Sequence, residues 1–586
     1  MHPTKRWRLK PAADEHAVQA LMHDRCPPVV AQLLAQRGIT SPQEASLFFR
    51  PGTDQLHDPF LLKDMQVAVE RIEKALGDGE RIMIYGDYDV DGTTAVALVY
   101  SFLSHLSSEV QFYIPDRYSE GYGISFKGID RAEEDGVSLI IALDCGIKSI
   151  DKVQYATERG IDFIICDHHL PGDELPAAVA VLDPKRPDCP YPCKELSGCG
   201  IGFKLMQALA KHNDLPWSDL EPLLDLVAVS TACDIVPIVG ENRVLAHLGL
   251  KRINASPRPG FKAMLRLANV KRALTITDLV FLIGPRINAA GRVEHGAMAV
   301  ELLLAHDEQQ AEQSGLRIDK NNAHRQGLDK EITRQVMERI EAQAGGEERW
   351  STVLYDPTWH KGVIGIVASR VIDQYYRPTV ILTESNGKAA GSARSVKDFD
   401  LYEAIGACSD LLEQFGGHMY AAGLTMPIAN IEAFAERFEQ EVRARMKPEQ
   451  RLPIEEVDME IGLHQVDLKL LNTLNHMAPF GPGNMKPVFL ARGVKDSGGL
   501  RIVGESHLKM TLMHPLDPSR RFDAIAFRQS HHIDLVRSGG PFSVLFTIEE
   551  NEWQGRVTLQ LNVKDIKPGV EGLLVGEEHS ASVTAR

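Results

Sequence analysis

The sequence predicts an α/β protein: a parallel-sheet domain joined by a long helix to a smaller α/β domain, plus a C-terminal OB-like β-barrel. Three observations support this fold class. Short runs rich in Ile and Val alternate with helical stretches over residues 81–245, which is typical of βαβ units. Residues 307–344 lack Pro and carry apolar residues at helical spacing, which predicts one long helix. After residue 451, strand patterns follow one another without long helices between them.

In chain order, we predict six segments. They are an N-terminal segment 1–60, a first α/β domain 61–255, a helical region with the long connecting helix 256–345, a second α/β domain 346–447, the β-barrel 453–567 and a loose tail 568–586. A helix is expected over Thr93–Leu106. The expected strands are Arg81–Tyr85, Val110–Ile114, Val137–Leu143, Ile161–Cys166, Ala178–Leu182, Phe542–Ile548 and Arg556–Val563, the last two joined by a turn over Asn551–Gly555.

The composition indicates a cytoplasmic globular protein. Hydrophobic residues make up 44% and charged residues 25% of the chain, and no run approaches the roughly 18 apolar residues of a membrane helix. No secretory signal is visible, and eight scattered cysteines do not form a disulfide framework. The net charge is −16, yet one segment is basic and holds no Asp or Glu. It is either a phosphate-tracking surface or a solvated helical face, and its cations are Arg243, Lys251, Arg252, Arg258, Lys262, Arg266, Lys271 and Arg272.

An acidic run, GDYDVDG, occupies residues 86–92 between a predicted strand and a predicted helix. In extended backbone, Asp87, Asp89 and Asp91 would share one face, with Thr93 or Thr94 capping the helix. Three converging carboxylates repel one another unless a cation neutralises them. By itself the run could equally be an exposed acidic loop.

Further acidic positions follow other apolar runs. Asp144 follows one predicted strand, the triplet Asp167-His168-His169 follows another, and Asp234 follows the apolar stretch 226–229. Because the carboxyl ends of parallel strands meet at one edge of a sheet, we expect a common centre. Carboxylate and imidazole ligands suit Mn²⁺ or Mg²⁺. There are enough ligands for two ions about 3.5–4 Å apart, an arrangement that hydrolyses phosphodiesters, and Asp144 is the candidate bridging ligand.

Cysteines offer a rival metal site. Cys189, Cys193 and Cys199 lie close together, but a fourth ligand at zinc-finger spacing is missing. Three other cysteines adjoin proposed ligands and are expected to face away from them as packing residues: Cys145, Cys166 and Cys233.

The triplet at 167–169 and the acidic positions resemble the signature of the DHH phosphoesterase superfamily. Five further motifs resemble its RecJ branch: GPRINAAGR (284–292), WHKGVIGIVASR (359–370), GSARS (391–395), GGHMYAAG (416–423) and PFGPGN (479–484). The resemblance spans nearly the whole chain. It implies that residues 61–255 are a DHH domain, 346–447 a DHHA1 domain and 453–567 a RecJ-type OB domain.

The resemblance also implies an activity, a metal-dependent 5′→3′ exonuclease specific for single-stranded DNA that releases 5′-mononucleotides in recombination and mismatch repair. The implied cofactors are two Mn²⁺ or Mg²⁺ ions. The implied partners are single-stranded DNA, a RecQ-type helicase and a single-strand-binding protein, and we expect a monomer without membrane association. The catalytic residues would be Asp87, Asp89, Asp91, Asp144, His168, His169 and Asp234, with Asp167 as an additional metal ligand.

Substrate contacts are expected from the downstream motifs. Arg394 can grip a phosphate with its planar fork, Gly416-Gly417-His418 forms an exposed turn, and Gly362 and Gly365 open a helix whose N-terminus could accept an anion. Near the scissile phosphate we expect Arg286, Asn288 and Arg292, the alternative being a polar loop between domains.

One position departs from the superfamily pattern. Small-molecule members place a His four residues before the first Asp of an Asp-x-Asp pair, and Tyr85 holds that place here. It therefore stays open whether Asp87 or Asp89 contacts metal. Two other functions also stay open. One is a phosphodiesterase of short oligonucleotides or cyclic dinucleotides, and the other is a non-catalytic scaffold like the member found in the eukaryotic replicative helicase, which has lost its ligands.

Overall fold

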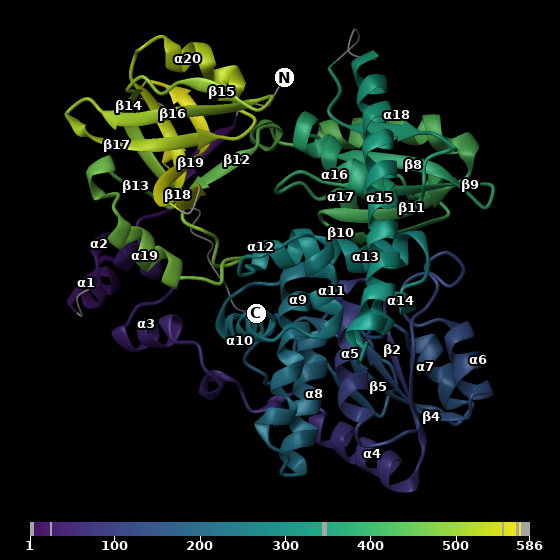
Figure 1. The fold of residues 1–586 in the computed structure, drawn as a ribbon. Helices are drawn as coiled ribbons and strands as arrows, with labels where there is room; N and C mark the ends of the chain where they lie inside the picture. The colour runs from purple at the N-terminus through teal and green to yellow at the C-terminus, as the bar shows by residue number, and fades with distance from the viewer. Residues whose placement is uncertain (1–4, 24–25, 343–347, 554–555, 570–573, 576–586) are drawn as a thin grey trace. The chain divides into compact units, whose positions relative to one another are not determined.

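A computed structural model describes residues 5–23, 26–342, 348–553, 556–569 and 574–575 (Figure 1). The chain forms two compact units. The parallel-sheet unit comprises residues 50–327 and 479–485, and the mixed-sheet unit comprises residues 1–49, 328–478 and 486–586. Within the described ranges, no helix combines the length and apolar character needed to cross a bilayer.

The parallel-sheet unit is built on a five-stranded sheet in the order β3-β2-β4-β5-β6, in which every pairing is parallel. Alternate residues of each strand enter different cores. Ile82 and Ile84 pack with helices α4, α5 and α8, whereas Met83 and Tyr85 pack with α6 and α7. All five predicted strands are confirmed, as β2 (Arg81–Gly86), β3 (Val110–Tyr113), β4 (Val137–Leu143), β5 (Asp162–Cys166) and β6 (Ala180–Leu182). The helices on its faces are α4 (Met65–Asp78), α5 (Val90–Leu103), α6 (Phe126–Glu134), α7 (Ile150–Thr157) and α8 (Gly198–His212).

Helix α5 begins earlier than predicted, at Val90. Asp89 is its N-cap, because the Asp89 carboxylate accepts a hydrogen bond from the Gly92 N–H at 3.0 Å. The predicted caps, Thr93 and Thr94, instead donate their hydroxyls to backbone carbonyls one turn earlier. Asp91 therefore lies in the first helical turn. The prediction that all three aspartates alternate along one extended strand is wrong.

A helical region completes the parallel-sheet unit. Its elements are α9 (Leu224–Cys233), α10 (Gly240–Ala255), α11 (Pro259–Leu267), α12 (Ile276–Asp278), the π-helix η5 (Leu279–Ile283), α13 (Gly284–Val293) and α14 (Ala297–Leu303). The single long helix is confirmed as α15 (Glu308–Ala342), which runs from one unit into the other at residues 327 and 328.

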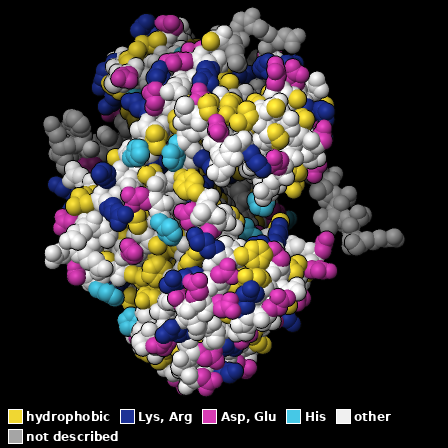
Figure 2. Space-filling view, turned by 90° about the vertical axis from the view of Figure 1, so that its right-hand side faces the viewer, with side chains coloured by type: hydrophobic (Ala, Val, Ile, Leu, Met, Phe, Trp, Pro, Cys, Tyr) yellow, Lys and Arg dark blue, Asp and Glu magenta, His cyan; other side chains and the backbone are white. Residues whose placement is uncertain are grey.

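Carboxylates from other parts of this unit pair with four of the eight cations of the basic segment 243–272. Arg258 pairs with Asp225 at 2.6 Å, and Arg272 pairs with Asp278 at 2.6 Å. Lys262 and Arg266 both approach Glu308. On the face drawn in Figure 2, which does not label this segment, Lys and Arg are interspersed among Asp and Glu. Ion-paired helical faces thus account for half of the cations of this segment, and the two alternatives stay open for the other half.

The mixed-sheet unit contains a five-stranded sheet in the order β10-β11-β9-β8-β7, covered by α16 (Ile364–Tyr375), α17 (Leu401–Gly406) and α18 (Ile431–Arg445). Its strands are β7 (Thr352–Tyr355), β8 (Thr379–Ser385), β9 (Lys388–Arg394), β10 (Gln414–His418) and β11 (Ala421–Met426). Only β7 and β8 pair in parallel. The smaller α/β domain is thus confirmed.

The C-terminal barrel is confirmed as a seven-stranded sheet, β13-β14-β18-β19-β17-β16-β15, which closes on itself through a β14–β16 pairing. Its strands are β13 (Met459–Glu460), β14 (Phe489–Asp496), β15 (Arg501–Val503), β16 (His507–His514), β17 (Asp517–Ala526), β18 (Phe542–Trp553) and β19 (Arg556–Pro568). Strand β18 continues through Asn551, so the predicted turn is shorter than expected. Gln554 and Gly555 of that turn lie outside the described residues.

A third sheet joins distant parts of the chain in the same unit. Strand β1 (Arg6–Leu9) pairs in parallel with β12 (Ile454–Val457) and with β20 (Leu574–Val575). The Trp7 indole donates to the Asp565 carboxylate at 2.6 Å. The N-terminal segment also holds α1 (Glu15–His23), α2 (Pro28–Ala35) and α3 (Pro42–Phe49). Most of the predicted tail, residues 570–573 and 576–586, lies outside the described residues.

Candidate metal centre

The predicted acidic positions meet at one edge of the parallel sheet. Asp87 follows β2, Asp144 follows β4, and the Asp167-His168-His169 triplet follows β5. Asp91 reaches the same place from the first turn of α5, and Asp234 reaches it from the C-cap of α9. The apolar stretch before Asp234 belongs to helix α9 and not to a strand of the sheet.

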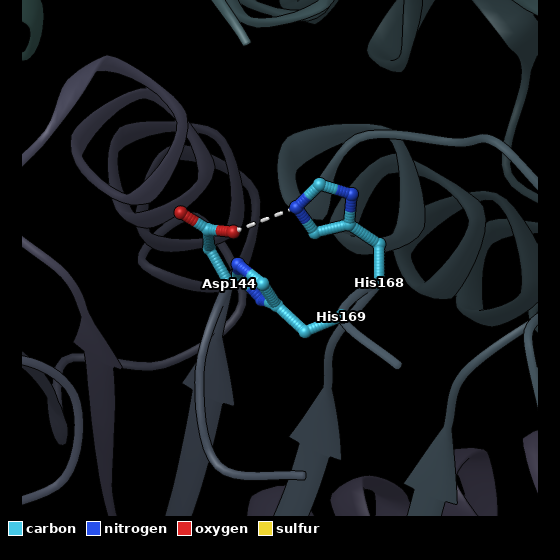
Figure 3. A group of neighbouring side chains, drawn as sticks. All are labelled: Asp144, His168 and His169. Carbon is cyan, nitrogen blue, oxygen red and sulfur yellow. Dashed lines mark ion pairs between the residues drawn. The ribbon is translucent and has the colours of Figure 1, made fainter. Parts of the chain in front are cut away.

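His168 lies at the middle of this cluster. Its Nε2 atom is 3.2 Å from Asp144 Oδ1, 3.5 Å from Asp234 Oδ2 and 3.8 Å from Asp91 Oδ2. The ring is buried, and neither of its nitrogens has a hydrogen-bond partner in the described part of the chain. Burial lowers the pKa of His168, so the imidazole is neutral at pH 7, the form that binds metals. In Figure 3 the His168 ring faces Asp144, with His169 beside them.

Two overlapping groups have metal-ligand geometry. One consists of Asp144, His168 and His169, and the other of Asp91, His168 and Asp234. In each group the ligand atoms all lie within 4.8 Å of one another. Across the described ranges, neither group contains a cysteine, and Cys189 Sγ instead accepts a hydrogen bond from the Lys63 N–H.

Asp91 is held rigidly by the N-terminus of α8. Its carboxylate accepts hydrogen bonds from the Gly198 and Cys199 N–H groups at 2.7 and 2.8 Å, and from the Ser230 hydroxyl at 2.6 Å. Gly198 also packs against Asp144, since a Cβ at position 198 would lie 2.6 Å from the Asp144 Cβ. One helix terminus thus fixes a carboxylate from each of the two groups.

Asp167 orients the triplet and belongs to neither group. Its Oδ2 accepts the Ile147 N–H at 2.9 Å, and its Oδ1 accepts the N–H groups of His168 and His169 and faces His169 Nδ1 at 2.8 Å. Burial opposes ionisation of Asp167, but the hydrogen bond and charge of His169 and the backbone N–H groups of Ile147 and His169 together outweigh it and lower the pKa. The paired Asp167 in turn raises the pKa of His169 against the effect of burial.

The remaining carboxyls have raised pKa values, because few hydrogen bonds or positive charges offset their burial. Burial, followed by repulsion from Asp89, raises the pKa of Asp87 to about 8. Burial and the Asp91 charge raise the pKa of Asp234 to about 9, and the same two causes raise that of Asp144 well above its ordinary value. Asp87 Oδ2 and Asp144 Oδ1 are buried without hydrogen-bond partners within the described residues. Unpaired buried oxygens beside a neutral imidazole fit a divalent cation, which would replace the repulsion by attraction.

Comparison with known proteins assigns the chain to a family. Family models match the DHH family N-terminal domain at residues 81–231, the DHHA1 domain at 351–444 and the RecJ OB domain at 457–565. The single-stranded-DNA-specific exonuclease RecJ of Bacillus subtilis is 37% identical over 567 residues, which cover 96% of this chain and 70% of that protein. The chain belongs to the RecJ family. The Escherichia coli RecJ is 32% identical, covering 92% of this chain and 96% of its own length.

Solved RecJ structures agree with this assignment. The crystal structure of Thermus thermophilus RecJ in complex with Mn²⁺ is similar at a TM-score of 0.83 and 29% identity, covering 97% of this chain and 80% of that one. A crystal structure of exonuclease RecJ bound to manganese is 34% identical, at a TM-score of 0.59, covering 68% of this chain and 97% of that one. The resemblance first seen in the motifs is thereby confirmed.

Tyr85, the departure from the superfamily pattern, packs on the sheet face covered by α6 and α7. Its hydroxyl donates to the Gly123 carbonyl at 3.0 Å and accepts the Ser125 N–H at 3.1 Å. Asp87 receives a long contact from the Gly123 N–H, at 3.4 Å, and a backbone hydrogen bond from Tyr88, whereas Asp89 is engaged as the helix cap. Of the two, Asp87 is the carboxylate with a free buried oxygen.

Two residues near the centre were missed by the sequence reasoning. Asp183 follows β6, is fully buried and has one oxygen without a partner among the described residues, and burial raises its pKa to about 7. The rule applied to the other strands, an Asp directly after an apolar run, would have found it. The Tyr122 hydroxyl lies 3.4 Å from His169 Nε2, and no sequence pattern signals that proximity.

The GPRINAAGR motif forms helix α13, so the alternative of a polar interdomain loop is wrong. Arg286 pairs with Asp319 at 3.0 Å, and the Arg292 carbonyl accepts the Tyr118 hydroxyl at 2.5 Å. A Cβ at Gly291 would lie 2.8 Å from the Tyr88 carbonyl oxygen. The motif therefore packs directly on the acidic run 86–92, and Asn288 is half-buried on the same helix.

In the mixed-sheet unit, Arg394 and His418 lie at the same end of the sheet. The strand residue between them is Ala421, which is in register with Arg394 on β9 and with His418 on β10. Gly365, in the first turn of α16, is so close that a Cβ there would lie 3.0 Å from Arg394 Nη2. The guanidinium therefore adjoins a helix N-terminus.

Gly416, Gly417 and His418 are exposed, but the prediction of a turn is wrong because they end strand β10. Gly417 is required there, since its φ is +147° and a Cβ would collide with the Ala421 carbonyl. The close pairing of β10 with β11 causes both the positive φ of Gly417 and the lack of space for a Cβ there.

Proposed function

We propose that this chain is a 5′→3′ exonuclease that hydrolyses single-stranded DNA with two divalent metal ions, Mn²⁺ or Mg²⁺, and releases 5′-mononucleotides. One observation carries the proposal. The two overlapping Asp/His groups, Asp144-His168-His169 and Asp91-His168-Asp234, lie at the carboxyl edge of the sheet in a chain of the RecJ family. Relatives along nearly the whole chain are named single-stranded-DNA-specific exonucleases.

The two groups would hold the ions, and Asp87 and Asp89 supply further carboxylates. When bound, such ions place positive charge at a scissile phosphate and acidify a water molecule. The chain's own contribution is to hold ligands in place. Asp91 is fixed by α8, and His169 is turned by Asp167, which acts as a positioning residue.

The mixed-sheet unit would determine that digestion starts at the 5′ end. Arg394 beside the first turn of α16, together with the exposed Gly417 and His418, supports a site for a terminal 5′-phosphate, since guanidinium and helix N–H groups both favour such an anion. Asn288 and Arg292 on α13 are proposed to contact DNA near the scissile phosphate. Arg286 would have to exchange its Asp319 partner to do so. A RecQ-type helicase and a single-strand-binding protein as partners, a monomeric state and a cytoplasmic location also remain proposals.

The decisive experiment follows 5′- and 3′-labelled single strands with Mn²⁺, Mg²⁺ or EDTA. We expect mononucleotides from the 5′ end with either ion and none in EDTA. Asp144→Asn, which keeps the side-chain shape, should abolish activity, whereas the exposed Asp151→Asn should not. Activity that persists in EDTA or in Asp144→Asn would refute the metal mechanism.

A series of substrate lengths separates the remaining alternatives. A preference for two- to five-mers over long strands would support a phosphodiesterase of short oligonucleotides. A chain that binds single strands but cleaves none with either ion would support the scaffold. The filled ligand positions argue against the scaffold, and the complete OB region argues against the short substrates.

A further inference from the structure

Ile235, the residue after the candidate ligand Asp234, has a strained backbone. Helix α9 ends at Cys233 with Asp234 as C-cap, and Ile235 then has a φ of +62°. Glycine is the usual residue at this position after a helix, because a left-handed φ brings a Cβ against the backbone. A β-branched side chain in this region is an outlier that costs folding free energy.

Packing within the protein does not compensate this cost, because the Ile235 side chain is 65% exposed. Its neighbours hold the segment instead, since Val236 and Ile238 are buried. The Ile238 N–H donates to the Pro482 carbonyl at 2.7 Å, and a Cβ at Gly481 would lie 2.5 Å from Ile238 Cγ1. The PFGPGN motif thus clamps this segment from a distant part of the chain while Ile235 faces solvent.

The position of Ile235 suggests what it contacts. The adjacent Asp234 carboxylate lies 3.5 Å from His168 Nε2, so the exposed Ile235 directly follows a candidate ligand of the metal centre in the chain. The candidate ligands at that centre are carboxylates and imidazoles, which suit metal ions and, through them, a phosphate. A nucleotide also has apolar faces on its sugar and base, which a neighbouring aliphatic side chain can cover.

We infer that Ile235 is a substrate-contacting residue that packs against the sugar and base of the nucleotide whose phosphate occupies the metal centre. This inference rests on the proposed exonuclease function and deepens it. The strained conformation is the means by which the apolar side chain is presented next to a metal ligand.

The test replaces Ile235 by Gly, which removes the side chain and the backbone strain together. Asp214→Gly is the matched control, because exposed Asp214 follows the end of α8 with a φ of +53° in the same unit. Both variants should keep or raise the melting temperature. Ile235→Gly should lower kcat/KM on single-stranded DNA on the order of tenfold with unchanged Mn²⁺ affinity, whereas Asp214→Gly should leave both at the wild-type values.

Ile235→Asn provides a second variant, since Asn tolerates a left-handed φ and lacks the apolar surface, and it should show the same loss. Wild-type kcat/KM in both Ile235 variants would overturn the inference. A fall in Mn²⁺ affinity that matches the fall in activity would also overturn it, because the residue would then act only through Asp234. A wild-type protein that degrades no single-stranded DNA would instead refute the proposed function.

Discussion

Binding of Mn²⁺ should expel protons from the centre at neutral pH. The metal-free protein holds Asp87 with a pKa of about 8 and Asp234 with a pKa of about 9, both raised chiefly by burial. At pH 7 carboxyls with such values are about 90% and about 99% protonated. Metal ligands must be ionised, so filling the centre should release about two protons, and more if Asp144 also ionises.

The same pKa values set two pH dependences. Metal affinity should rise with pH by about tenfold per pH unit for each proton released, up to the pKa of the group concerned. The stability of the metal-free protein should change in the opposite direction. Since the folded state holds protons that the unfolded chain has lost above about pH 4, unfolding free energy falls as pH rises toward 8–9, by about 1.4 kcal/mol per unit and proton.

Titration calorimetry with Mn²⁺ at pH 7, in two buffers that differ in ionisation enthalpy, measures the number of protons released. Asp234→Asn should release about one proton fewer than the wild type. Asp151→Asn, which changes an exposed carboxyl that belongs to neither ligand group, should release the same number as the wild type. Release of less than half a proton, or an affinity that is flat between pH 6 and 8, would refute the electrostatic account of the centre.

Three further predictions test other parts of the molecule. Lys204 and Glu241 form a buried ion pair at 2.9 Å, so Lys204→Met should lower the unfolding free energy in urea by ~3–5 kcal/mol. Part of this loss should return in the double variant with Glu241→Gln, which removes the unpaired charge and keeps an acceptor for the Tyr191 hydroxyl, and a loss below about 1 kcal/mol in the single variant would contradict the prediction. Gly291→Ala forces a Cβ to 2.8 Å from a carbonyl of the acidic run, so it should weaken Mn²⁺ binding and lower stability by ~1–3 kcal/mol, unlike Gly327→Ala, where the space is open. Arg394→Lys should reduce the preference for 5′-phosphorylated over 5′-hydroxyl strands by about 10–100-fold, and an unchanged ratio would exclude Arg394 from the phosphate site.

The parallel sheet and the location of the centre could be predicted because both depend on local pattern. Apolar runs of strand length separated by helical stretches determine a parallel sheet, and parallel strands place their carboxyl ends together. An Asp after each run is then enough to bring Asp87, Asp144 and the His168-His169 pair to one edge. The glycine-rich motifs identified the family, which the spacing of apolar residues does not indicate.

The roles of individual side chains depended on contacts between residues far apart in the chain. Sequence pattern predicts Asp91 and Asp167 equally as metal ligands. In the structure Asp91 belongs to a metal-ligand group, whereas both oxygens of Asp167 accept hydrogen bonds from backbone N–H groups and His169. The basic segment 243–272 contains no acid, but folding brings Asp225, Asp278 and Glu308 to it. The sequence by itself therefore determined the sheet, its acidic edge and the family. Only the tertiary structure decided which carboxylates are left uncompensated, because burial and hydrogen bonding are properties of the packed chain and not of its local pattern.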